Sequence, residues 1–206
     1  RSKTYVNKIL EKVSGEYYKN YNINKVERKT NSVRLFYGDD SEFFDYDKVV
    51  FATHADQTIS ILKNPSDEEK NILSKFNYKK NMAVIHTDEN VMPLNKKAWS
   101  SWNSSINSDN LGECSITYWL NKLQNLKIDK NIFLTLNPYF KIDENMIVKK
   151  VEFTHPYYNQ ETLISQKNLS TIQNKKNILF CGSYFGYGFH EDGIKSSIDM
   201  LKFLDD

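Results

Sequence analysis

The stretch "FCGSYFGYGFHEDGIKSS", residues 180–197, leads from a predicted strand into a predicted helix through a loop that holds four of the chain's seven glycines. After the loop, Ile194, Ile198 and Leu201 recur at helical spacing, and we expect them to anchor the helix in the core. Because glycine has no Cβ atom, such a loop lets a ligand come close to the backbone. An ordinary strand-to-helix turn has the same pattern, and the residues alone favour that simpler interpretation.

The start of this predicted helix carries negative charge. His190, Glu191 and Asp192 stand there, and no lysine or arginine comes shortly before them. Backbone amides at a helix start attract anions and carbonyl oxygens. Two carboxylates would repel a phosphate but not a neutral carbonyl oxygen, so a neutral acceptor is the ligand that the pattern favours.

The composition excludes several classes of protein. The chain has 206 residues, 39% of them hydrophobic, and a formal net charge of +2, which indicates one large or two small domains and gives no basic patch for nucleic acid. No apolar run approaches the length of a membrane span, about 20 residues. The cysteines, Cys114 and Cys181, are far apart and read as core thiols of a reducing compartment, so we expect a cytoplasmic protein. The spacing of the histidines matches no metal site.

The middle of the chain has the pattern of an antiparallel sheet. Alternation in "SITYW" and "IFLTL" predicts that Val84 and Ile85, Ile116 and Tyr118, and Phe133 and Leu134 belong to one such sheet. The run "VVFAT", residues 49–53, reads as a strand covered on both faces. Ser66 and Glu69 form a capping box that opens a helix, and residues 160–173 read as another helix. The fold class that follows is α+β, with α/β-like parts at the two ends.

Two tryptophans stand three residues apart in "KKAWSSWN". We favour packing of Trp99 and Trp102 in a core, and an aromatic wall beside a substrate is the alternative. The sequence contains neither a GxGxxG turn nor a P-loop, so the chain carries no nucleotide-binding fingerprint of its own.

Several segments taken together resemble one family. They are "VVFATHADQTISIL", "AVIHTDENVMP", "KKAWSSWN", "TYWLNKLQNL", "FLTLNP", "VEFTHP" and "CGSYFGYGFHEDGIKSS". The chain is similar to the carboxyl-terminal half of bacterial FAD-binding proteins of the flavin-containing amine oxidase superfamily, described as predicted NAD/FAD-binding proteins. A similar flavoprotein domain is fused to plant cyclopropane fatty acid synthases. The resemblance covers almost the whole chain and keeps the family's order of motifs.

The resemblance implies a two-domain flavoprotein whose GxGxxG unit lies outside this chain. Residues 1–62 would belong to the FAD-binding domain, residues 63–158 to a substrate domain, and residues 159–206 to the FAD-binding domain again. The chain begins with Arg1 rather than Met, and we expect it to be part of a longer protein. Its partner would then be the missing amino-terminal FAD-binding half. Without that half, we expect that the chain alone does not retain FAD. We also expect exposed apolar surface, so that the chain either pairs with another copy of itself or needs its missing half.

The resemblance also implies site residues. The family's contacts to FAD match Val26, Ala52, Thr53, Gly182, Ser183, Tyr184, Asp192, Gly193 and Ile194. Monoamine oxidases place a lysine near the flavin where Asn81 stands here, so oxidation of an amine by oxygen is not implied. For the substrate pocket we expect His190 and Tyr187, with Trp99 and Trp102 as wall candidates.

The expected function is hydride transfer from a carbon substrate to FAD, as part of an oxidoreductase. The substrate would be a small molecule or a lipid, such as an unsaturated acyl group. The alternative is a non-catalytic truncated or remnant module that binds no cofactor by itself.

Overall fold

The computed structural model of the chain describes residues 2–39 and 41–204. The chain divides into two compact units. One unit, here called the sheet unit, is Asn77–Tyr157, and the other, the discontinuous unit, combines Arg1–Phe76 with Tyr158–Asp206. The assignment of such units to FAD and to substrate stays a prediction, and each unit is described by itself.

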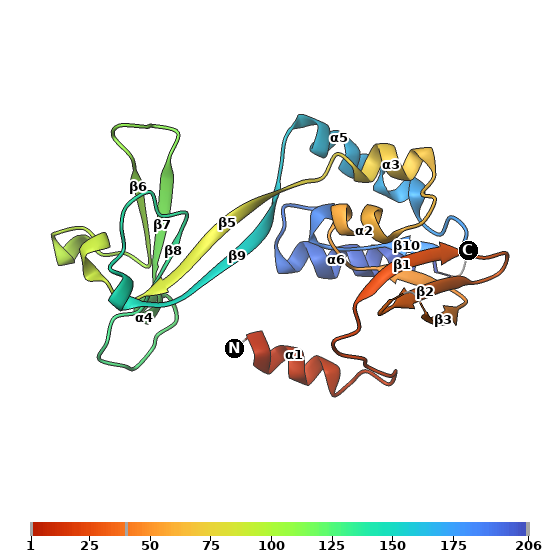
Figure 1. Ribbon diagram of the computed structural model, residues 1–206, viewed down its shortest axis with the longest axis horizontal. Coiled ribbons are helices and arrows are strands. Elements are labelled where there is room, and N and C mark those ends of the chain that lie inside the picture. Colours follow the sequence, from red (N-terminus) through yellow and green to blue (C-terminus); the bar gives the residue numbers. More distant parts are fainter. Residues whose placement is uncertain (1, 40, 205–206) are drawn as a thin grey trace. The chain divides into compact units, whose positions relative to one another are not determined.

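The described elements are short helices and ten strands (Figure 1). The α-helices are α1 (Ser2–Leu10), α2 (Ala55–Ile61), α3 (Asp67–Leu73), α4 (Leu120–Leu123), α5 (Gln160–Asn168) and α6 (His190–Leu201). The strands are β1 (Ile23–Arg28), β2 (Val33–Tyr37), β3 (Glu42–Tyr46), β4 (Val49–Phe51), β5 (Asn77–His86), β6 (Trp102–Ile106), β7 (Cys114–Trp119), β8 (Phe133–Leu136), β9 (Ile147–Tyr157) and β10 (Ile178–Phe180). Single 3₁₀ turns form η1 (Glu89–Val91), η2 (Lys96–Ala98), η3 (Glu144–Met146), η4 (Leu169–Ile172) and η5 (Ser183–Phe185).

The sheet unit is built on one five-stranded antiparallel sheet in the order β6-β7-β8-β5-β9. The long strands β5 and β9 run side by side over most of their length (Figure 1). The prediction that β5, β7 and β8 share one antiparallel sheet is therefore confirmed, and so is the α+β fold class.

One face of this sheet is a buried core. Phe133 is fully buried and packs with Met92 and Trp99. Beside it runs a line of buried polar groups: His86 Nε2 lies 2.8 Å from Thr135 Oγ1, which lies 2.9 Å from Thr117 Oγ1. Alternation along the strands sends the neighbouring side chains to the opposite face.

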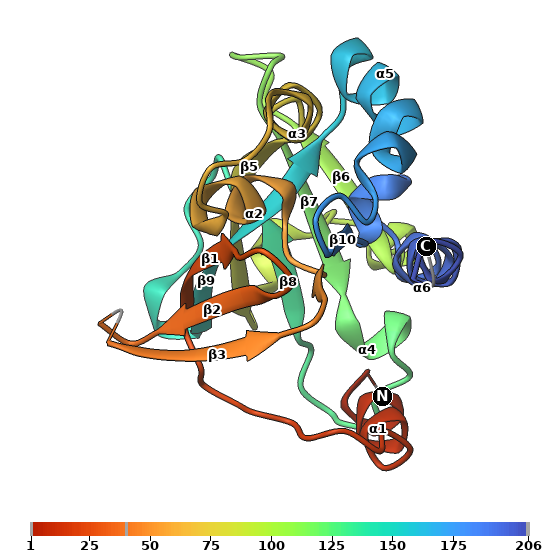
Figure 2. The same cartoon turned by 90° about the vertical axis from the view of Figure 1, so that its right-hand side faces the viewer.

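The discontinuous unit contains two small sheets. β4 and β10 pair in parallel, and the rings of Phe51 and Phe180 stack at the end of the pair with centroids 5.8 Å apart. β1, β2 and β3 form an antiparallel sheet (Figure 2). Val50 of β4 is 40% exposed. The expectation that this strand is covered on both faces is therefore wrong, although the strand does have a parallel neighbour, β10. The expectation of exposed apolar surface in this segment is confirmed.

Local signals for helices are confirmed in part. Ser66 Oγ accepts from the Glu69 amide, and the Glu69 carboxylate accepts from the Ser66 amide, which is the expected capping box. The same carboxylate is fully buried against Arg28. The single helix expected over residues 160–173 is wrong at its end, since α5 stops at Asn168 and a 3₁₀ turn follows.

The expectation that the apolar stripe of α6 anchors it in the core is wrong. Ile194, Ile198 and Leu201 are 56%, 58% and 54% exposed. The helix instead buries the side that carries Ser196 and Met200, where Met200 packs with buried side chains of the β10 segment. Helical spacing identified the helix, but the position of β10 decides which side of it is buried. More than half of each of the three side chains of the apolar stripe is exposed.

Candidate functional site

The carboxyl ends of β4 and β10 meet at one edge of the parallel pair. The Cys181 amide donates to the Phe51 carbonyl oxygen across 2.9 Å, which brings Ala52 and Thr53 alongside Gly182. Gly182 has a φ of +147°, and a Cβ atom there would lie 2.9 Å from the Tyr184 ring. The carboxyl edge of a parallel sheet is where α/β proteins bind ligands. Four of the residues expected to bind the cofactor, Ala52, Thr53, Gly182 and Ser183, are therefore brought together there.

In the glycine-rich loop that follows, residues 182–189, backbone amides donate to the side chain of Asp192. Its carboxylate accepts from the amides of Tyr187 and Phe189, each across 3.0 Å. A Cβ atom on Gly186 would lie 2.2 Å from Asp192 Oδ1, so only glycine leaves room for this carboxylate. Asp192 therefore shapes the loop through hydrogen bonds to its backbone.

Two further side chains hold the loop, and no sequence pattern pointed to either of them. Gln166 of α5 donates through Nε2 to the carbonyl oxygens of Tyr184 (3.0 Å) and Gly186 (2.6 Å). Ser196 of α6 accepts from the Gly182 amide across 2.9 Å and donates to the Gly193 carbonyl oxygen. The loop is thus held by α5 on one side and by α6 on the other.

The start of α6 leaves backbone donors at the end of the loop. The helix begins at His190, and the Gly193 amide already donates to the Phe189 carbonyl oxygen across 3.2 Å. An α-helix leaves its first amides without an acceptor inside the helix, here those of His190, Glu191 and Asp192. These amides, one turn earlier than Gly193 and Ile194, are the donors that the helix presents.

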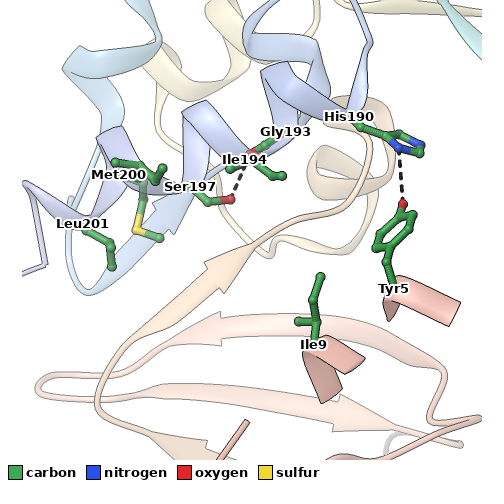
Figure 3. Close-up of a pocket in the computed structure, with 9 residues that line it drawn as sticks. Tyr5, Ile9, His190, Gly193, Ile194, Ser197, Met200 and Leu201 are labelled. Atoms are coloured by element: carbon green, nitrogen blue, oxygen red, sulfur yellow. Dashed lines mark hydrogen bonds between the residues drawn. The ribbon is translucent and has the colours of Figure 1, made fainter. Parts of the chain in front are cut away.

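Beside the helix start lies an apolar groove of about 490 Å³ between α1 and α6 (Figure 3). Tyr5 and Ile9 line it from α1, and Ile194, Ile198 and Leu201 from α6. At its end, Tyr5 Oη lies 3.2 Å from His190 Nδ1 (Figure 3). The exposed stripe of α6 is therefore one wall of a groove.

Tyr158 brings a buried hydroxyl to the same unit. Its ring centroid is 6.2 Å from that of Tyr187, which is itself exposed. Burial raises the pKa of Tyr158, and the charge of Asp192 raises that pKa further. Within the part of the chain that the structure describes, the Tyr158 hydroxyl has no hydrogen-bond partner. A buried polar atom of this kind usually has a partner, and the sequence did not single it out.

The other expected site residues lie elsewhere. Val26 is buried in β1, and its carbonyl oxygen accepts from the Lys63 amide across 2.8 Å. Trp99 is buried in the core of the sheet unit, which agrees with the interpretation that we favoured. Trp102 is 62% exposed and its ring lies 4.9 Å from that of Tyr118 on the opposite face of that sheet, so the core packing expected for Trp102 is wrong. The core position expected for Cys114 is also wrong, since Cys114 is exposed, whereas Cys181 is buried.

The residues of the discontinuous unit fit a flavin. The Gly182 backbone carries no side chain, and the Tyr184 ring fills the side on which a Cβ atom would stand, so a ligand would meet this backbone from its other side. The available donors are backbone amides and the Tyr158 hydroxyl, which suit neutral carbonyl and hydroxyl acceptors.

Within residues 2–39 and 41–204, no group of three His, Cys, Asp or Glu side chains could hold a metal ion. No described helix is long and apolar enough to cross a membrane.

No family model and no curated protein matches the chain. Solved structures do match it. A fatty acid isomerase from P. acnes matches 93% of this chain with 49% of its own, at 14% identity and a TM-score of 0.64. Putrescine oxidase bound to putrescine matches 97% of this chain with 52% of its own, at 8% identity and a TM-score of 0.61. Cyclohexylamine oxidase from Brevibacterium oxydans IH-35A matches 90% of this chain with 49% of its own, at 9% identity and a TM-score of 0.55.

These matches define a class of fold. The chain spans about half the length of the structures it matches, and it has the fold of that half of an amine-oxidase-type chain. The fold relationship expected from the sequence motifs is therefore confirmed. Identities of 8–14% carry the likeness of fold and leave the activity to be argued from the site.

Proposed function

We propose that this chain is part of an FAD-dependent oxidoreductase that transfers a hydride from a carbon substrate to the flavin. The observation that carries the proposal is the meeting of the β4 and β10 ends, where Gly182 opens a glycine-rich loop that leads into α6. The chain would supply the carboxyl-terminal FAD contacts and the substrate-side sheet. A GxGxxG unit, which the chain does not contain, would hold the pyrophosphate.

Bound FAD would supply the hydride acceptor, and the protein's own part is binding, orientation and electrostatics. The backbone at Gly182 and Ser183 would lie against the cofactor. The first amides of α6 would donate to a carbonyl oxygen of the ring, and the helix dipole would favour negative charge there by about 0.3–1 kcal/mol. The Tyr158 hydroxyl would gain the acceptor that it lacks among the described residues.

We propose an unsaturated acyl group as the substrate. Two observations support it: a fatty acid isomerase is among the matching structures, and Asn81 stands where the amine oxidase resemblance leads us to expect lysine. The amine oxidases among the matches make amines the comparison class in any substrate panel.

The test uses this chain fused to, or co-expressed with, a GxGxxG unit from its own longer protein. We expect a visible flavin spectrum that bleaches with unsaturated acyl substrates and not with amines. Gly188 has a φ of +92°, and Gly188→Val should block flavin binding. Gly38→Val is the matched control, because Gly38 also has a positive φ, +67°, but lies in another turn.

The control variant should lose stability and keep its FAD affinity. If Gly188→Val binds FAD as tightly as the unmodified protein, the loop is only a turn. If the fused protein binds no flavin at all, the chain belongs to a non-catalytic remnant module.

A further inference from the structure

The second face of the sheet in the sheet unit, here called the open face, is apolar and only partly covered. Cross-strand pairs place Ile85 beside Leu134, and Leu134 beside Tyr118. Tyr118 pairs with Trp102, which is 62% exposed. The buried core occupies the opposite face, so this row of side chains has no core to fill.

A polar corner lies on the open face where the first residues of β5 run beside the last residues of β9. Lys79 pairs with His155 and Asn81 with Phe153, so all four side chains belong to this face. Lys149 lies on the same open face, near the other end of the β5–β9 pair, where it pairs with Ile85. The paired positions of β5 and β9 on this face, all of which the structure describes, carry no carboxylate.

The hydrogen bonds at this corner run in one direction, and a backbone amide sets that direction. The Met82 amide can only donate, and it donates to Asn137 Oδ1 across 2.9 Å. Asn137 Nδ2 must then be the donor to Asn81 Oδ1, across 2.7 Å. The remaining amide group of Asn81 is a donor, and it lies 3.1 Å from His155 Nδ1. This nitrogen is therefore an acceptor, and the proton of the neutral ring sits on Nε2.

With its proton on Nε2, His155 offers a hydrogen-bond donor to a ligand. Among the described residues, this Nε2 has no hydrogen-bond acceptor. A donor beside Lys79, at the edge of an apolar face without carboxylates, matches a ligand that has an oxygen acceptor at one end and an apolar chain.

We propose that His155 is the anchoring residue for the carboxylate or carbonyl oxygen of an acyl chain, and that Asn137 and Asn81 hold it in the donor tautomer. The acyl chain would lie along the open face toward Trp102. This inference rests on the proposed acyl substrate, but the tautomer does not depend on it.

The first arm of the test measures the tautomer in the 206-residue chain. The ¹⁵N NMR signals of His155, assigned by their loss in His155→Phe, are recorded above the ordinary histidine pKa of about 6.5. We expect a protonated Nε2 and an unprotonated Nδ1. In Asn81→Asp, the carboxylate can only accept, so the proton should move to Nδ1. Asn90→Asp adds the same charge at an exposed position of the same unit and should leave the tautomer unchanged. A proton on Nδ1 in the unmodified chain would overturn the proposal.

The second arm measures binding of dodecanoate, with dodecyltrimethylammonium as a probe of equal chain length and opposite charge. Dodecanoate should shift the signals of His155 Nε2 and of the ring of Phe153, which pairs with Asn81 on the same face, and the cation should not shift His155. His155→Phe keeps a ring at this position and should weaken dodecanoate binding about 5- to 10-fold.

The outcomes separate the anchor from the proposed function. Equal dodecanoate affinity in His155→Phe would refute the anchor even if the acyl class is right. Dodecanoate that shifts no open-face signal would refute the acyl ligand. Whether the longer protein binds FAD is read separately, from its visible spectrum.

Discussion

The Nε2 amide of Gln166 donates to the carbonyl oxygen of Gly186 across 2.6 Å, which ties the middle of α5 to the glycine-rich loop twenty residues later. The same nitrogen also donates to the Tyr184 carbonyl oxygen. The loop therefore has a fixed shape before any ligand arrives, and preorganised backbone donors and acceptors bind a ligand at a lower entropic cost.

Replacing Gln166 with alanine should loosen the loop. Two carbonyl oxygens would lose their donor, and we expect a loss of about 1–2 kcal/mol in the free energy of unfolding. Hydrogen exchange of the amides in residues 182–189 should accelerate. Gln160→Ala is the control, because Gln160 is exposed in the first turn of the same helix. Equal exchange rates in the two variants would show that Gln166 does not hold the loop.

Gly186→Ala should displace the Asp192 carboxylate, since the added Cβ atom would lie 2.2 Å from Asp192 Oδ1. The amides of Tyr187 and Phe189 would lose their acceptor, and we expect a destabilisation of about 1–3 kcal/mol by denaturant unfolding. Gly15→Ala is the matched control, with no atom within 4 Å of the added Cβ. A Gly186→Ala variant as stable as the Gly15→Ala variant would contradict this account of the loop.

The ion pair between Glu69 and Arg28 predicts a large effect of Glu69→Ala. The Glu69 side chain is fully buried and that of Arg28 is 13% exposed. Removing one partner leaves the other charge buried without compensation, which costs about 3–5 kcal/mol. Asp67 on the same helix faces Lys70 at 3.9 Å and is almost fully exposed, so Asp67→Ala should cost less than about 1 kcal/mol. Equal unfolding free energies for the two variants would contradict the prediction.

The buried histidine of the sheet core predicts a loss of stability in weak acid. Burial lowers the pKa of His86 below its ordinary value, although the nearby Asp88 opposes the shift. The unfolded chain therefore binds a proton more readily than the folded chain, and the free energy of unfolding falls as the pH drops below about 6.5. His86→Gln should remove this slope between about pH 6.5 and 5, as measured by urea unfolding at several pH values. An unchanged slope would assign the effect to another group.

The 206-residue chain by itself should purify without a stoichiometric flavin absorption band. It contains no GxGxxG turn, and that turn with its helix N-terminus holds the pyrophosphate in dinucleotide-binding proteins. The measurement is a visible spectrum of the purified chain after incubation with FAD and gel filtration. A retained flavin band at neutral pH would contradict the prediction.

The sequence by itself determined the elements that depend on neighbouring residues. Period-two alternation identified the strands β7 and β8, and Ser66 with Glu69 identified the start of α3, because a side chain three residues away caps the helix. The glycines of residues 182–188 identified a strand–loop–helix connection, since only the absence of a Cβ atom permits the backbone found at Gly182.

The tertiary structure alone decided which faces of these elements are buried and which distant residues meet. The stripe of Ile194 and Ile198 has the spacing of a buried helix face, but the side chains that pack on α6 lie against its other side. Asn81 and Asn137 are 56 residues apart and meet through the pairing of β5 with β8. Periodicity describes one element at a time, whereas burial and hydrogen-bond direction depend on its spatial neighbours, and these are fixed only when the chain folds.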